Sequence, residues 1–231
     1  YTLITGLSYT NAIPFPKAGN TGVLWFLPML FCVRCIFYGI MKISKDNNFF
    51  AFLMIAFSAL LGMFLNSKGY WLPWSIDVAL FSVAFYYLGY IFRKYSIFSV
   101  LIQKPLYTLL WLGIWLFGVY QGIVLELATR NYSGDLTCIL IALAGSVVFC
   151  MLAYYLDKIP MVKAVLSWAG QKTIIIMCIH QLEWIFIKYE DYGVQQGYKL
   201  FLVKITIIFA ITIAIDFFYN TMRGIINNET E

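Results

Sequence analysis

The feature that most constrains this chain is a series of long apolar runs separated by short polar segments. The runs cover residues 22–41, 48–66, 72–92, 106–127, 136–156, 165–187 and 200–222. A helix needs about 20 residues to cross the hydrocarbon core. Strands are excluded as spans, because open sheet edges leave backbone groups unpaired in lipid and the runs lack the alternation of a barrel strand. We therefore predict an all-α polytopic transmembrane bundle of about seven spans, with residues 1–231 forming a single domain.

Composition agrees with a membrane protein and argues against other classes. Hydrophobic residues make up 62% of the 231 residues, and only 12% are charged, which is about half the charged fraction of a soluble domain. The lysines and arginines behind the net charge of +5 are scattered, with no stripe that could follow phosphates. Membrane lipid is the expected partner, and nucleic acid is not.

Charges in the loops predict the orientation in the membrane. The loops after the first, third and fifth runs are predicted to be cytoplasmic, because basic residues collect on that side; they carry Lys42, Lys45, Arg93, Lys94, Lys104, Lys158 and Lys163. This orientation places Tyr1 outside and the C-terminus in the cytoplasm. A protein that starts in the cytoplasm must then have an odd number of further spans upstream, so we expect this chain to be truncated at its N-terminus.

Three short segments, in this order and spacing, resemble the acyltransferase-3 family, especially its members similar to fucose 4-O-acetylases. Residues 22–31 (GVLWFLPMLF) are similar to the family's G-x-L-W-F-L-P-x-L-F. Residues 72–90 open with LPWSIDVAL and end with FYYLGY, similar to L-P-W-x-x-D-x-A-L followed by F-Y-x-L-G. Residues 168–180 (WAGQKTIIIMCIH) are similar to I-G-K-x-S-L-x-I-x-x-x-H, with Gln171 and Thr173 in place of the family's Lys and Ser.

The resemblance implies a complete protein of about ten helices in the bacterial inner membrane. It implies an enzyme that transfers an acetyl group from acetyl-CoA to a hydroxyl of an extracytoplasmic glycan or lipid-linked sugar, as in the modification of cell-envelope polysaccharides. The family's main catalytic histidine lies on its first helix, which would precede this chain. We therefore expect the 231 residues alone to be inactive. Acetyl-CoA would be the acyl donor, with no bound cofactor or metal.

His180 and Glu183 are the predicted catalytic residues of this chain. His180 is the only histidine and falls inside the sixth run, where an ionisable side chain indicates a functional site. Glu183 follows at i+3 on the same helical face, so its carboxylate could bind one imidazole nitrogen and fix the tautomer. The alternative is a neutral histidine that serves packing alone.

Arg34 lies near the middle of the first run, too deep to reach the membrane surface easily. We expect it to face the bundle interior or a wet cavity, where an anion must meet it. Asp216, inside the seventh run, is the expected structural partner. The alternative is that Arg34 binds the phosphates of coenzyme A.

Asp77, Trp25 and Trp74 lie at predicted external ends of spans and are the remaining predicted substrate-binding residues. Asp77 comes in the first turn after Pro73, where a carboxylate is favoured by unpaired amides and the helix dipole. This capping role competes with contact to an acceptor sugar. Either tryptophan could stack on a sugar ring or simply anchor the helix at the interface.

Two other function classes stay open. A secondary transporter or flippase for a glycan or small solute would also need an aromatic, sparsely charged bundle, although such proteins usually contain repeats with broken helices, and the sequence shows no repeat. A non-catalytic membrane scaffold is the third class. Cys32 and Cys35 form a C-x-x-C inside a span, without the second ligand pair that a zinc site would need.

Overall fold

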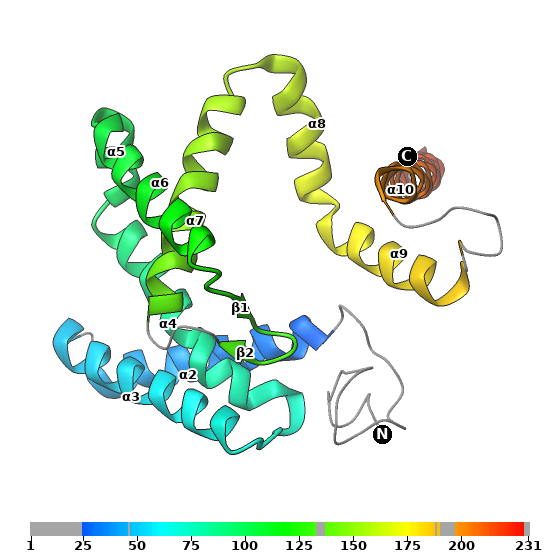
Figure 1. The fold of residues 1–231 in the computed structure, drawn as a ribbon. Helices are drawn as coiled ribbons and strands as arrows, with labels where there is room; N and C mark the ends of the chain where they lie inside the picture. Colours follow the sequence, from blue (N-terminus) through cyan, green and yellow to red (C-terminus); the bar gives the residue numbers. More distant parts are fainter. Residues whose placement is uncertain (1–24, 46, 133–136, 188, 190–196, 229–231) are drawn as a thin grey trace. The chain divides into compact units, whose positions relative to one another are not determined.

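The computed structural model of the chain is a set of helices with one small hairpin (Figure 1), and it describes residues 25–45, 47–132, 137–187, 189 and 197–228. The elements in chain order are α2 (Phe26–Ser44), α3 (Asn48–Ser67), a short 3-10 helix (Pro73–Ser75), α4 (Ile76–Lys94), α5 (Ile97–Gln103), α6 (Pro105–Tyr120), β1 (Leu125–Glu126), β2 (Asn131–Tyr132), α7 (Thr137–Leu156), α8 (Pro160–Gln171), α9 (Thr173–Phe186) and α10 (Tyr198–Asn228).

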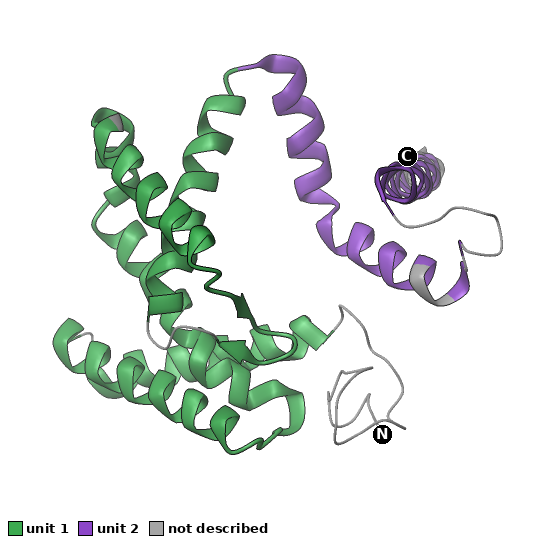
Figure 2. Cartoon of the chain, in the orientation of Figure 1, with its two compact units in different colours: residues 1–158 green, residues 159–231 purple. Residues whose placement is uncertain are grey.

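Five of the described helical segments are long and apolar enough to cross a membrane, and the number is seven if each of two sharply bent helix pairs is counted as one span. These segments fit the predicted all-α helical bundle. Contacts divide the chain into two compact units (Figure 2), unit 1 over residues 1–158 and unit 2 over residues 159–231. The single domain over 1–231 stays a prediction.

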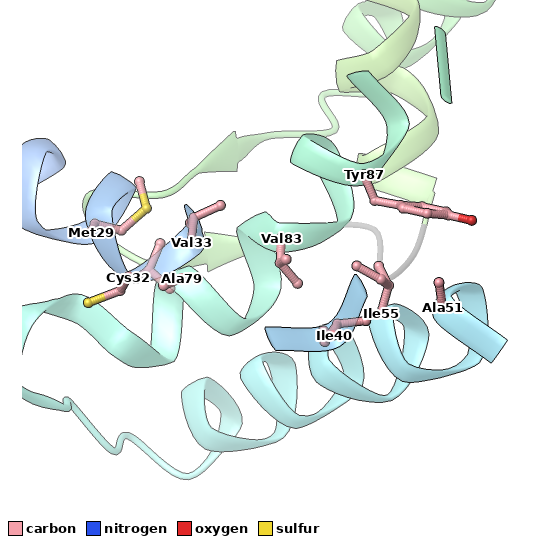
Figure 3. Close-up of a cluster of buried hydrophobic side chains, with 10 residues drawn as sticks. Met29, Cys32, Val33, Ile40, Ala51, Ile55, Ala79, Val83 and Tyr87 are labelled. Carbon is pink, nitrogen blue, oxygen red and sulfur yellow. The ribbon is translucent and has the colours of Figure 1, made fainter. Parts of the chain in front are cut away.

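In unit 1, the helices α2, α3 and α4 pack against one another around an apolar core (Figure 3). The helix α2 contributes one face, which contains Met29, Val33 and Ile40. These three positions recur at the spacing of a helical face, since successive residues turn by about 100°. Val83 of α4 and Ile55 of α3 complete the contact, so each helix turns its buried side toward the other two.

The pairing of α3 with α4 also uses polar contacts and a close approach. The Ser58 hydroxyl donates to the Leu80 carbonyl at 2.9 Å, and the Tyr87 hydroxyl donates to the Asn48 carbonyl at 3.1 Å. At Gly62, an added Cβ would lie only 2.7 Å from the Phe81 backbone nitrogen and 2.9 Å from the Asp77 carbonyl oxygen. Glycine is therefore required there for the two backbones to come so close.

The fourth predicted span, 106–127, is wrong at its C-terminal end. The helix α6 ends at Tyr120, and Gly122 takes up a left-handed conformation with φ of 66°. The chain then forms an antiparallel hairpin in which Leu125 pairs with Tyr132 and Glu126 with Asn131. Apolar side chains after Gly122 extended the predicted run; in the structure Ile123 and Leu125 pack beside Phe81 and Cys138.

The sixth predicted span, 165–187, is two helices in the structure of unit 2. The helix α8 ends at Gln171 and α9 begins at Thr173, and the two are bent by 70°. The Lys172 backbone N–H bonds the Trp168 and Ala169 carbonyls, which closes α8, while its own carbonyl accepts from Ile176 N–H in α9. The helix α9 in turn packs against α10.

The close approach at Gly62 can be tested by adding a single methyl group. We expect Gly62→Ala to lower the free energy of unfolding by about 1–3 kcal/mol, the typical cost of overpacking, because the methyl group meets backbone atoms that cannot rotate away. The matched control is Gly39→Ala in α2, where nothing lies within 4 Å of the added Cβ. Thermal unfolding in detergent measures both variants. Equal melting temperatures would contradict the packing described for α3 and α4.

Candidate functional site

The predicted pair of His180 and Glu183 is formed on α9. The His180 Nδ1 atom lies 3.1 Å from the Glu183 Oε2 atom, across one turn of the helix. Their side chains differ sharply in exposure, with 45% of the His180 side chain accessible and only 1% of the Glu183 side chain. The carboxylate is thus buried behind the ring, and the imidazole lies at the accessible side of the pair.

Lys204 of α10 is a third member of this cluster that sequence analysis missed. Its Nζ atom lies 3.6 Å from Glu183 Oε1, the carboxylate oxygen that does not face His180. The same ammonium lies 5.2 Å from the ring centroid of Tyr189, within the range of a cation–π contact. We call Lys204, Glu183 and His180 the α9–α10 triad.

The α9–α10 triad has the layout of a base held by an orienting carboxylate. A carboxylate that binds one imidazole nitrogen leaves the other nitrogen for a substrate proton, as in histidine bases that activate a hydroxyl. Placed among apolar helices, such a pair works at low dielectric, where its electrostatic effect is larger than in water. The arrangement therefore suits proton transfer from a hydroxyl.

A second polar cluster of unit 2 lies where α8 meets α9. It contains Asp216, the expected partner of Arg34. Asp216 of α10 forms a salt bridge with Lys172 and accepts a hydrogen bond from the Trp168 indole at 3.1 Å. The carboxylate that the sequence analysis assigned to Arg34 thus has partners from its own unit.

Arg34 itself is exposed on α2, so it lies outside the packed core of unit 1. Val33 and Ile40 face the core of unit 1. Because each residue turns the helix by about 100°, Arg34 lies more than a quarter turn from Val33 and points off the packed face. The expectation that it faces the bundle interior or a wet cavity stays a prediction.

Asp77 is buried in unit 1 by Arg130 from the hairpin. The Arg130 Nε atom lies 2.6 Å from Asp77 Oδ2, and the two side chains are 2% and 1% exposed. The Arg130 guanidinium lies 3.7 Å from the Trp71 ring centroid, and Asp77 also accepts from the Leu72 N–H at 3.1 Å. These contacts favour the local structural role of Asp77 over contact with a sugar, since a sugar would have to displace Arg130.

The aromatic residues predicted to meet a sugar lie in different surroundings within unit 1. Trp74 is 41% exposed and contacts Phe31 edge-on, with centroids 6.2 Å apart. Trp25 is partly buried against the core of unit 1. Trp74 and Ser75 have left-handed φ values of 57° and 54°, which cost energy in residues other than glycine and are concentrated at functional or tightly constrained sites. Of the two tryptophans, Trp74 presents the more accessible ring.

Tyr132 packs the hairpin against α4. Its ring stacks on Phe81 with centroids 4.5 Å apart. Burial raises the pKa of the Tyr132 hydroxyl above its ordinary value, against the opposing effect of the nearby Arg130 charge. The Asn66 amide holds the same hairpin by donating to the Arg130 carbonyl at 2.8 Å. The hairpin is therefore part of the packed structure of unit 1.

The structure brings His180 and Glu183 together in unit 2, while Trp25, Arg34, Trp74 and Asp77 belong to unit 1. Among the described residues, no group of three or more His, Cys, Asp or Glu side chains could hold a metal ion. Comparison with protein-family models, curated proteins and solved structures finds no match to this chain. The acyltransferase-3 resemblance therefore rests on the three motifs alone.

The buried Asp77–Arg130 pair gives a stability prediction. We expect Arg130→Met to lower the free energy of unfolding by about 3–5 kcal/mol, the usual cost of leaving a buried charge unpaired. Asp77→Asn should cost a similar amount, and the double variant less than the sum of the two. The control is Lys68→Met, whose exposed side chain should change stability by about 0.5 kcal/mol or less. Thermal unfolding in detergent reports all four, and additive single effects would contradict a direct pair.

Proposed function

We propose that this protein is a membrane-embedded O-acyltransferase that moves an acetyl group from acetyl-CoA to a hydroxyl of an extracytoplasmic glycan or lipid-linked sugar. The observation that carries the proposal is the 3.1 Å contact between His180 Nδ1 and Glu183 Oε2, with the carboxylate buried and the ring accessible. An intramembrane base of this kind is costly to keep without a function. The three sequence motifs supply the reaction class.

In the proposed reaction, the sugar hydroxyl donates a hydrogen bond to His180 Nε2, which is this chain's part of the acceptor site beside the main catalytic histidine that the resemblance places upstream. As the proton leaves, the hydroxyl oxygen attacks the thioester carbonyl carbon of acetyl-CoA, and a tetrahedral oxyanion forms. The carbon–sulfur bond then breaks, the acetyl ester stays on the sugar, and the coenzyme A thiolate takes up the proton. A positioned base of this kind contributes about 100- to 10,000-fold to the rate.

Two residues of unit 1 have properties that suit the substrates. The accessible Trp74 ring could stack on a sugar, since aromatic faces bind apolar surfaces of rings. The exposed Arg34 guanidinium could pair with the phosphates of coenzyme A, because its planar fork matches phosphate oxygens.

The test is acetyl transfer in membranes that contain the complete protein. We expect His180→Ala to lower the transfer of labelled acetyl groups to the glycan by about 100-fold or more, the smaller end of general-base effects, and Glu183→Met to lower it by roughly tenfold, as loss of a hydrogen bond to a charged group would. Cys178→Ala, two positions before His180, is the control and should keep full activity. A fully active His180→Ala variant at equal protein level would refute the proposal.

Transport of a glycan or small solute is the second candidate, because one observation favours it. The break between α8 and α9, with the Lys172–Asp216 pair beside it, resembles the discontinuous helices that hold substrates in secondary transporters. Proteoliposomes separate the two functions. Movement of the sugar across the bilayer without acetylation would favour transport, and acetylation of a sugar supplied on the outer side would favour group transfer.

A further inference from the structure

We infer that Lys204 of α10 is a positioning residue that acts through Glu183 to hold His180 neutral, with its proton on Nδ1 and with Nε2 free to accept. The inference deepens the proposed function, on which its catalytic meaning rests. The arrangement itself depends only on the contacts within unit 2.

The first step concerns the charge of Glu183. Its side chain is 1% exposed, and a carboxylate buried to this extent needs a compensating charge or a proton. Lys204 supplies a positive charge at 3.6 Å. Lys172, another lysine that pairs with a carboxylate in unit 2, binds Asp216 instead. Among the described residues, Lys204 is therefore the lysine that compensates the negative charge of Glu183.

The second step concerns His180. A lysine cation and a glutamate anion already balance, so a charged imidazole would give the α9–α10 triad a net charge of about +1 among apolar helices, which is unfavourable at low dielectric. His180 is then neutral. An ionised carboxylate only accepts hydrogen bonds, so the Nδ1 atom that faces Glu183 Oε2 at 3.1 Å must be the donor.

The third step follows from the two ring nitrogens of a neutral imidazole. If Nδ1 carries the proton, Nε2 holds a lone pair, and the accessible part of the ring can present it to a hydroxyl. The surrounding polar groups fit this assignment. Tyr189 offers its ring face to the Lys204 ammonium, and its hydroxyl is a neutral donor beside the Glu183 carboxylate. Gln181 precedes Glu183 on α9 as another buried polar residue. Neither of them is a charged group.

The chain offers a direct measurement, because His180 is its only histidine. The full chain is produced with ¹⁵N-histidine and a purification tag that contains no histidine, and is placed in lipid nanodiscs near neutral pH. The ¹⁵N chemical shifts then report which ring nitrogen is protonated. For the wild type we expect the neutral Nδ1–H form. Either the Nε2–H form or a doubly protonated ring would overturn the inference.

Variants test the role of Lys204. We expect Glu183→Met and Lys204→Met each to lower the ratio of the Nδ1–H form to all other forms by at least about tenfold, the effect of losing a hydrogen bond to a charged group. In Lys204→Met, the proton that replaces the lysine charge goes either to Glu183, whose O–H can then donate to Nδ1, or to His180, which becomes doubly protonated, and both results lower the share of that form. Lys204→Arg should restore it.

The matched control is Lys172→Met, which removes the lysine of the Lys172–Asp216 ion pair of unit 2 and should leave the His180 spectrum unchanged. An unchanged spectrum in folded Lys204→Met, or an equal change in Lys172→Met, would refute the positioning role. If Lys204→Met does not fold, the wild-type and Lys204→Arg spectra still decide. The spectra need no substrate, so the predicted tautomer together with absent acetyl transfer in membranes that contain the complete protein would reject the proposed function and keep the triad.

Discussion

Apolar side chains gain no hydrophobic free energy by leaving lipid for one another, so helices in hydrocarbon associate through close packing and polar contacts. The contact between α3 and α4 uses both. Gly62 lets the two backbones approach, and the Ser58 hydroxyl donates to the Leu80 carbonyl. The Asp77–Arg130 pair then attaches the hairpin to the start of α4. Each of these contacts involves a small or polar residue in an apolar sequence, and each would be lost in a chain that kept only the hydrophobic pattern.

The need for polar contacts between helices in lipid also sets the antiparallel direction of α10 relative to α9. Lys172, just before α9, meets Asp216 late in α10, and Glu183 near the end of α9 meets Lys204 early in α10. In the first pair the lysine comes from the α9 side and the carboxylate from α10, and in the second pair this order is reversed. A parallel arrangement would bring the lysines together at one end and the carboxylates at the other, and such like-charge contacts work against the wrong alignment. Thr212 lies between the charges of α10, fully buried, with its hydroxyl bonded to a carbonyl of its own helix.

The sequence predicted what depends on local pattern. Apolar runs located the long helices, because span length and composition are sufficient for that, and the spacing of His180 and Glu183 placed them one helical turn apart. Long-range partners were missed: Arg130 is 53 positions from Asp77, and Lys204 has no sequence signal that distinguishes it from other lysines near span ends. The break at Lys172 carries no proline and is accompanied by a contact with Asp216 on another helix. Arg34 was expected to face the bundle interior or a wet cavity because a charge in lipid is costly, and that cost alone does not specify which side of α2 it occupies.

The polar groups of unit 2 also bear on the choice between acyl transfer and transport. Transporters use the unpaired carbonyls of a broken helix to bind ions. At the end of α8, the Trp168 and Ala169 carbonyls accept from the Lys172 N–H, and the Gly170 carbonyl accepts from the Thr173 hydroxyl at 2.8 Å. Asp216 is already bound to Lys172. The break is thus closed by its own neighbours, whereas His180 keeps one ring nitrogen for which the described part of the chain gives no partner. A nitrogen that can accept a proton on a half-exposed ring is what the proposed acyl transfer requires, whereas the described carbonyls at the helix break are already bound to their neighbours.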